Sequence, residues 1–176
     1  MMERLAWVLA LVLLAACGGA QVRPDGGKGL LPEGSQVPDL SQNDQEGRAV
    51  KLREDVPTLV YFYPRAGTPG CTKEACAFRD AWQRYESAGL RVIGVSSDDE
   101  EDQAKFAKEH QLPFSLIADP EHVWSSAFGV GSFIGMDSRV SFLVDAQGNI
   151  KHVYHDVDPG VHAQEVLDDA KQRGLL

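Results

Sequence analysis

The sequence predicts one α/β domain, in which a central mixed β-sheet is flanked by helices. Strand-like apolar runs alternate with amphipathic stretches along most of the chain, and a tight turn joins the last two runs. The composition is that of a globular protein, since 43% of the 176 residues are hydrophobic and 24% are charged. This length favours a single domain with one substantial core.

Apolar runs are expected to form the strands of the sheet. They are "TLVYFY" (58–63), "RVIGVS" (91–96), "FSLIA" (114–118), "VSFLVD" (140–145) and "IKHVYH" (150–155). The turn-forming sequence "DAQGN" lies between the last two of them and predicts a hairpin. An earlier short hairpin is expected in residues 36–52, around the turn sequence "NDQEG".

Helices are expected between or after these strands, at 70–87, 99–110, 120–127 and 160–173. Gly89 ends the first helix, and Asp98 or Asp99 can cap the second. Phe78, Trp82 and Tyr85 recur on one face of the first helix, and we interpret them as core residues.

The first residues differ from the rest of the chain. Leu5–Ala16, "LAWVLALVLLAA", contains twelve uncharged residues, which is the size of a signal-peptide core and well short of the ~20 residues that span a bilayer. The following "LAAC" resembles the bacterial lipobox, which predicts a signal peptide at 1–16 and lipidation of Cys17. A plain secretory signal, cut near Ala16 or Ala20, is the alternative.

The glycine-rich stretch after Cys17 predicts a tether between membrane and domain. Residues 18–35 hold six glycines and show no apolar period, so that a flexible chain here reaches roughly 23 Å. We therefore expect a lipidated Cys and tether at 17–35 and a folded domain at 36–176. The protein is expected to be exported and membrane-anchored, on the periplasmic or cell-surface side.

The charge pattern argues against nucleic acid as a partner, and the sequence contains no metal-binding motif. A formal net charge of -9 without clusters of Lys and Arg argues against binding to nucleic acid. The five histidines form no known metal-binding sequence, and the run "DDEEDQ" at 98–103 is explained as the acidic first turn of a helix.

Cys71 and Cys76 are the cysteines left for chemistry after Cys17, and in an exported protein such a pair first suggests a permanent disulfide. Their spacing argues otherwise. Residues i and i+5 of a regular helix have Cα atoms about 8.6 Å apart, whereas a disulfide needs about 4.4–6.8 Å. The helical pattern of "CTKEACAFRDAWQRYESAG" therefore indicates a redox switch whose oxidised form unwinds the helix. A static disulfide stays open if this segment is not helical.

The position of Cys71 favours a nucleophile. It is expected in the first turn of a helix, where unpaired N–H groups and the helix dipole stabilise a thiolate. Thr68 can hydrogen-bond a sulfur or a bound oxygen substrate, and Pro64 can shield the sulfur from water. Such a thiolate suits attack on a peroxide O–O bond, after which a second thiol condenses with the sulfenic acid. This chemistry requires no metal or organic cofactor.

The segment "YPRAGTPGCTKEAC" is similar to the active site of the peroxiredoxins, specifically the Q or bacterioferritin-comigratory-protein subfamily of thiol peroxidases. Pro64, Thr68 and Cys71 match its Pro-x3-Thr-x2-Cys pattern. The resemblance implies a thioredoxin-like fold, a peroxidatic role for Cys71 and a resolving role for Cys76. It also assigns Arg139, in "SRVSFLVDAQGNI", to stabilise the thiolate and the leaving oxygen.

The resemblance extends from about residue 36 to the C-terminus and implies a hydroperoxide as substrate and a thioredoxin-like protein as reductant. A monomer is expected, because the resolving thiol lies in the same chain. Two other activities are alternatives. A thiol-disulfide oxidoreductase typically uses Cys-x-x-Cys, and a copper chaperone of this fold would need Cys-x3-Cys and a histidine. A static lipoprotein with a structural disulfide is the non-enzymatic alternative.

Overall fold

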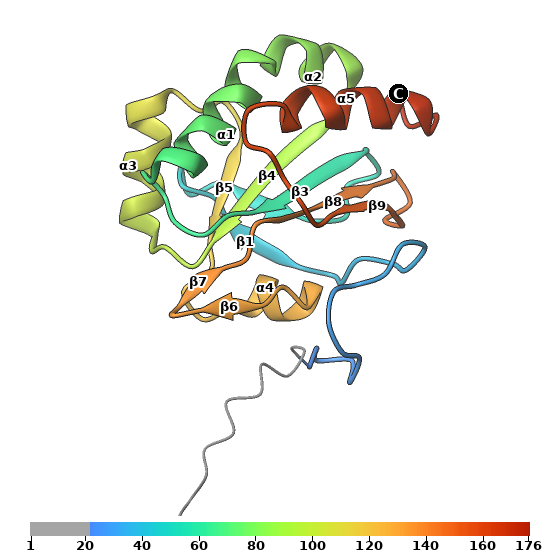
Figure 1. Ribbon diagram of the computed structural model, residues 1–176, viewed down its shortest axis with the longest axis horizontal. Helices are drawn as coiled ribbons and strands as arrows, with labels where there is room; N and C mark the ends of the chain where they lie inside the picture. Colours follow the sequence, from blue (N-terminus) through green and yellow to red (C-terminus); the bar gives the residue numbers. More distant parts are fainter. Residues whose placement is uncertain (1–21) are drawn as a thin grey trace, which may run out of the picture.

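A central β-sheet organises the protein in the computed structural model, which describes residues 22–176 (Figure 1). Within these residues the sheet has five strands in the order β5-β4-β3-β8-β9. They are β3 (Thr58–Phe62), β4 (Arg91–Ser96), β5 (Ser115–Ala118), β8 (Val140–Val144) and β9 (Ile150–Tyr154). β3, β4 and β5 are parallel, whereas β8 is antiparallel to β3 and β9 to β8. The predicted mixed sheet is confirmed, with strand ends within one residue of those expected.

The central strand β3 is buried on both faces of the sheet. Leu59 and Tyr61 join the core cluster on one side, and Val60 and Phe62 join the cluster on the other. This explains why the segment is continuously apolar instead of alternating. Beside it on β4, a Cβ atom at Gly94 would lie 2.8 Å from the Tyr61 ring, so the close packing of this ring requires glycine.

Helices α1 (Pro69–Asp80), α2 (Trp82–Ala88) and α5 (His162–Gln172) cover one face of the sheet (Figure 1). Phe78 and Tyr85 are fully buried there, as predicted, while Trp82 is only partly buried. The helix predicted at 70–87 is divided at Ala81, which ends α1 and begins α2. Gly89 ends α2 in the left-handed conformation that glycine adopts most easily.

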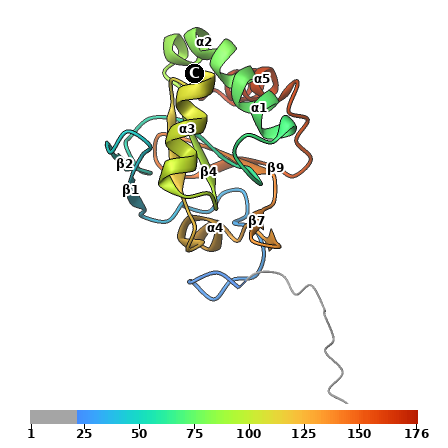
Figure 2. The ribbon, with the colours of Figure 1, turned by 90° about the vertical axis from the view of Figure 1, so that its left-hand side faces the viewer.

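Helix α3 (Glu100–His110) lies at the edge of the same layer (Figure 2). It begins with a side-chain cap. Asp99 accepts a hydrogen bond from the Asp102 N–H, as the sequence predicted for Asp98 or Asp99.

The opposite face is covered by helix α4 (Val123–Phe128) and by the hairpin of β1 (Ser41–Asn43) and β2 (Ala49–Lys51). Trp124 and Phe128 fill the core on this side. A second hairpin, β6 (Ser132–Phe133) and β7 (Met136–Asp137), follows α4. The sequence did not predict it because its strands have two residues each and Phe133 is exposed.

Part of the segment predicted as a flexible tether packs against the domain, which corrects the expected boundary at residue 36. Leu31 is buried and its N–H donates to the Phe128 carbonyl. Gly34 donates to the Ile150 carbonyl, and the Ile150 N–H donates to Ser35. The glycines suggested flexibility, but these backbone hydrogen bonds and the buried leucine attach residues 31–35 to α4 and β9.

The predicted signal peptide at 1–16 and the lipidation site Cys17 lie outside the described residues. From residue 22 onward, no helix has the length and apolar character needed to cross a bilayer.

Candidate active site

A sharp connection between β3 and α1 places Cys71 at the start of the helix. Thr68 occupies the N-cap position and Pro69 the first helical position, so Cys71 is the third residue of α1. Pro at this position costs no hydrogen bond, because the first N–H groups of a helix have no partner within it. The thiol group belongs to the buried core, since Cys71 is only 1% exposed. The predicted placement of Cys71 in the first turn is therefore observed.

Arg139 reaches the Cys71 sulfur from the residue before β8. Its Nη2 donates to Cys71 Sγ at 3.2 Å, and its Nη1 donates to Glu74 Oε2. Burial alone would lower the pKa of Arg139, but Glu74 and Cys71 hold that pKa above its usual value. A positive charge is thus fixed beside the sulfur.

Glu74 is a site residue that the sequence analysis missed. It lies one turn after Cys71 on α1 and is fully buried, and its Oε1 has no hydrogen-bond partner among residues 22–176. Burial raises its pKa to about 7, although Arg139 opposes this shift. Glu74 holds the guanidinium between itself and the sulfur.

A buried polar network fixes the loop before Cys71. Asp98 Oδ2 accepts hydrogen bonds from the Ala66 N–H and from Ser96 Oγ, each at 2.7 Å. Gln103 Nε2 donates to Ser96 Oγ, and the Tyr63 hydroxyl donates to Gln103. The network joins the end of β3, the loop, β4 and α3, so it positions the start of α1, and none of these hydrogen bonds involves the sulfur.

Within residues 22–176, Thr68 does not form the hydrogen bond to a sulfur that the sequence allowed. Its hydroxyl donates to the Arg65 carbonyl at 3.0 Å, and no hydrogen bond to Cys71 is found among the described residues. The cause is the local turn, because a Thr at an N-cap can bond to nearby backbone instead. Pro64 is partly buried where the chain leaves β3.

Cys76 lies on the same helix as Cys71, and both residues are free cysteines. Because α1 is intact over both, the pair has the helical separation that prevents a disulfide. Cys76 Sγ lies 4.0 Å from His110 Nδ1, and Arg79 donates to the His110 carbonyl at 2.9 Å. The proximity of His110 to Cys76 was not predicted, because His110 comes from a different helix, α3.

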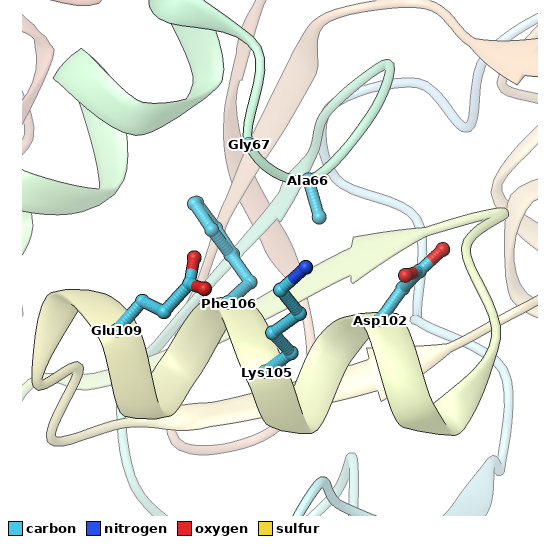
Figure 3. A pocket seen from close by; sticks show the side chains of 6 residues that line it. All are labelled: Ala66, Gly67, Asp102, Lys105, Phe106 and Glu109. Carbon is cyan, nitrogen blue, oxygen red and sulfur yellow. The ribbon is translucent and has the colours of Figure 1, made fainter.

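Two hollows flank this region. Ala66 and Gly67 of the loop, with Phe106 of α3, line a small cavity of about 120 Å³, towards which Lys105 points (Figure 3). Neither cysteine lines it. A larger open depression of about 480 Å³ is lined by Arg139 and by residues 155–158. Only the second hollow shares a residue with the sulfur site.

Comparison with known proteins connects this geometry to a family. Residues 34–153 match the AhpC/TSA family. The chain is 40% identical over 151 residues to peroxiredoxin Bcp of Escherichia coli K12, which covers 81% of this chain and 97% of that protein. The chain belongs to the peroxiredoxin Q/Bcp family. Members of this family are thiol-dependent peroxidases.

A peroxiredoxin also provides a structural match. Peroxidoxin BcpB from Mycobacterium tuberculosis superposes with a TM-score of 0.75 and 30% identity, covering 81% of this chain and 97% of that one. The thioredoxin-like peroxiredoxin fold is thereby confirmed. The chloroplastic peroxiredoxin Q of japonica rice is 38% identical over 144 residues, and the match spans 79% of this chain and 66% of the rice protein.

The raised pKa of Glu74 predicts a pH-dependent stability. The folded state binds this proton more tightly than the unfolded state, so stability is highest below pH 4.5 with respect to this group and falls as pH rises to about 7. Across this pH range we expect the free energy of unfolding of the wild type to fall by on the order of 2 kcal/mol because of Glu74. Glu74→Gln should not show this fall. Urea denaturation of both proteins at pH 5 and pH 7.5 measures it. Glu86→Gln, at an exposed position on α2, is the control and should show the same fall in the free energy of unfolding as the wild type. An equal fall in Glu74→Gln would contradict the role given to Glu74.

Proposed function

We propose that this chain reduces hydrogen peroxide and organic hydroperoxides at Cys71. The observation that carries the proposal is the hydrogen bond from Arg139 Nη2 to the buried Cys71 Sγ at the start of α1. The thiolate attacks one oxygen of the peroxide, the O–O bond breaks, and Cys71 becomes a sulfenic acid. The other oxygen leaves with a proton as water or an alcohol. Steady-state turnover with each peroxide and a thioredoxin-like reductant tests this activity.

The guanidinium of Arg139 supports this reaction in two ways. It stabilises the attacking thiolate, and it lies where negative charge develops on the leaving oxygen. Because Arg139 also lines the open depression of about 480 Å³, we propose that the peroxide approaches from that side. Glu74 keeps the guanidinium in place from the buried side.

Cys76 is proposed to resolve the sulfenic acid. Its thiolate attacks Cys71 Sγ, the sulfenic oxygen leaves as water, and an intramolecular disulfide forms. This step requires α1 to unwind, because both cysteines lie on one regular helix. His110, whose Nδ1 lies 4.0 Å from Cys76 Sγ, is placed to accept the thiol proton. A thioredoxin-like protein then reduces the disulfide.

Cys76→Ser is expected to separate the two half-reactions. The variant should consume one equivalent of peroxide at the wild-type rate and then stop, because its Cys71 sulfenic acid has no partner in the chain. Mass spectrometry with a sulfenic-acid trap measures the product. Continued turnover of this variant with a dithiol protein reductant would contradict the role of Cys76.

We also propose that the protein is an exported lipoprotein, monomeric and anchored through Cys17. The support is the apolar stretch Leu5–Ala16 followed by "LAAC". Its reductant must then be a thioredoxin-like protein outside the cytosol. Mass spectrometry of membrane-fractionated protein is expected to find lipid on Cys17, and mature protein without it would contradict the anchor.

The alternative activities are less well supported by the site. A thiol-disulfide oxidoreductase typically uses Cys-x-x-Cys and a copper chaperone of this fold would need Cys-x3-Cys with a histidine, whereas four residues separate Cys71 from Cys76. Insulin reduction and Cu(I) titration test these alternatives directly.

A further inference from the structure

Three potential metal ligands meet away from the cysteines. Asp119 follows β5, His122 precedes α4, and Asp137 lies on β7. One ligand atom from each of them lies within 4.8 Å of the others. The positions are separated by up to eighteen residues in sequence, which is why no metal motif was visible.

Asp137 is the residue that points to a missing partner. It is 2% exposed, and its Oδ1 lies 3.2 Å from His122 Nδ1. Its Oδ2 is also buried and has no hydrogen-bond partner within residues 22–176. A buried carboxylate oxygen without a partner is costly, and a bound cation would remove that cost.

Asp119 is held rigidly and retains capacity for one more ligand. Its Oδ1 accepts from the N–H groups of Val123 and Trp124, and its Oδ2 accepts from Ser125, at 2.7, 3.1 and 2.9 Å. A carboxylate has about four acceptor positions, so three hydrogen bonds leave about one for a metal ion.

The surroundings favour entry of a cation. The side chain of His122 is 29% exposed, so the cluster is accessible from solvent. Asp119 also lines an adjoining hollow of about 560 Å³, whose other acidic residues are Asp99, Glu100, Glu101 and Glu121. These carboxylates concentrate cations beside the cluster.

We propose that Asp119, His122 and Asp137 form a binding site for a divalent transition-metal ion, with Zn²⁺ as the probe. Two carboxylates and one imidazole are a donor set that suits Zn²⁺, with water at the remaining position. Because Asp137 precedes Arg139 by two residues, a metal ion here would connect α4 to the start of β8. The site is independent of the proposed peroxidase activity.

Isothermal titration with Zn²⁺ tests the site in the full chain carrying Cys17→Ser, Cys71→Ser and Cys76→Ser, so that no thiolate contributes. We expect one equivalent to bind, and Asp137→Asn in this background to weaken binding at least about tenfold. Asp156→Asn, at an exposed acidic position, is the matched control and should bind as the parent does.

A second readout keeps the test valid if the variant is unstable. Bound Zn²⁺ should raise the melting temperature of the parent and of Asp156→Asn, but not that of Asp137→Asn or His122→Gln. Absence of binding to the parent, or equal binding by Asp137→Asn and Asp156→Asn, would overturn the proposal.

Discussion

Cys71→Ser should abolish the fast reduction of peroxide, leaving only the slow reaction of an ordinary free thiol such as Cys76. The hydroxyl of serine is not ionised at neutral pH and cannot accept an oxygen atom to form the equivalent of a sulfenic acid. Serine fills nearly the same space at the start of α1, so the fold should persist. Peroxide consumption, followed by a colorimetric assay under single-turnover conditions, measures the effect.

Cys76→Ser is the matched control for this prediction. It also replaces a thiol on α1, but at a position that acts only after the peroxide has reacted. The first equivalent of peroxide should therefore be consumed by Cys76→Ser and not by Cys71→Ser. Equal single-turnover reaction of both variants would show that the reactive thiol lies elsewhere.

Arg139→Gln is expected to reduce the second-order rate constant with hydrogen peroxide by about 10²–10³-fold, the range for loss of one preorganised donor to a developing charge. The variant removes the donor found 3.2 Å from Cys71 Sγ. Stopped-flow measurement of the single-turnover rate tests it. Arg84→Gln, which removes an arginine from the surface of α2, should react at the wild-type rate.

The loss of Arg139 also leaves Glu74 buried without its cation, which is expected to destabilise the fold. Glu74→Gln/Arg139→Gln removes both charges and separates these effects. We expect the double variant to remain slow, although its stability recovers relative to Arg139→Gln. Recovery of the wild-type rate in the double variant would contradict a direct role for Arg139 at the sulfur.

The sequence predicted the sheet well because its signals are local. Residues 91–96 were expected as a strand and form β4 with the same bounds, since a buried parallel strand is a short continuous apolar run. The break at Ala81 was not predicted. Its neighbours continue the helical pattern on both sides, and no Gly or Pro marks the change from α1 to α2.

The candidate site was predicted in part. The position of Cys71 at a helix start indicated a nucleophile, whereas Arg139 was assigned by resemblance alone, and the structure places the two in contact. Glu74 was missed because a glutamate in a helical pattern normally indicates a solvated face. Only the tertiary fold shows that this face of α1 meets Arg139.

The same limit applies to contacts between distant segments. Asp98 was one of two candidates for the helix cap, but Asp99 takes that position and Asp98 supports the loop before Cys71 through the Ala66 N–H. Asp137 lies in a hairpin too short to produce a strand pattern. Such partners are set by the fold of the chain and leave no local period to detect.

The central claim is that Cys71 is oxidised by peroxide and resolved by Cys76. Its most direct test is stopped-flow mixing of the reduced protein with one equivalent of hydrogen peroxide, followed by mass spectrometry of both cysteines. We expect peroxide loss far faster than with a free thiol, and a Cys71–Cys76 disulfide within one chain. Peroxide loss no faster than with a free thiol, or oxidation that bypasses Cys71, would contradict the account.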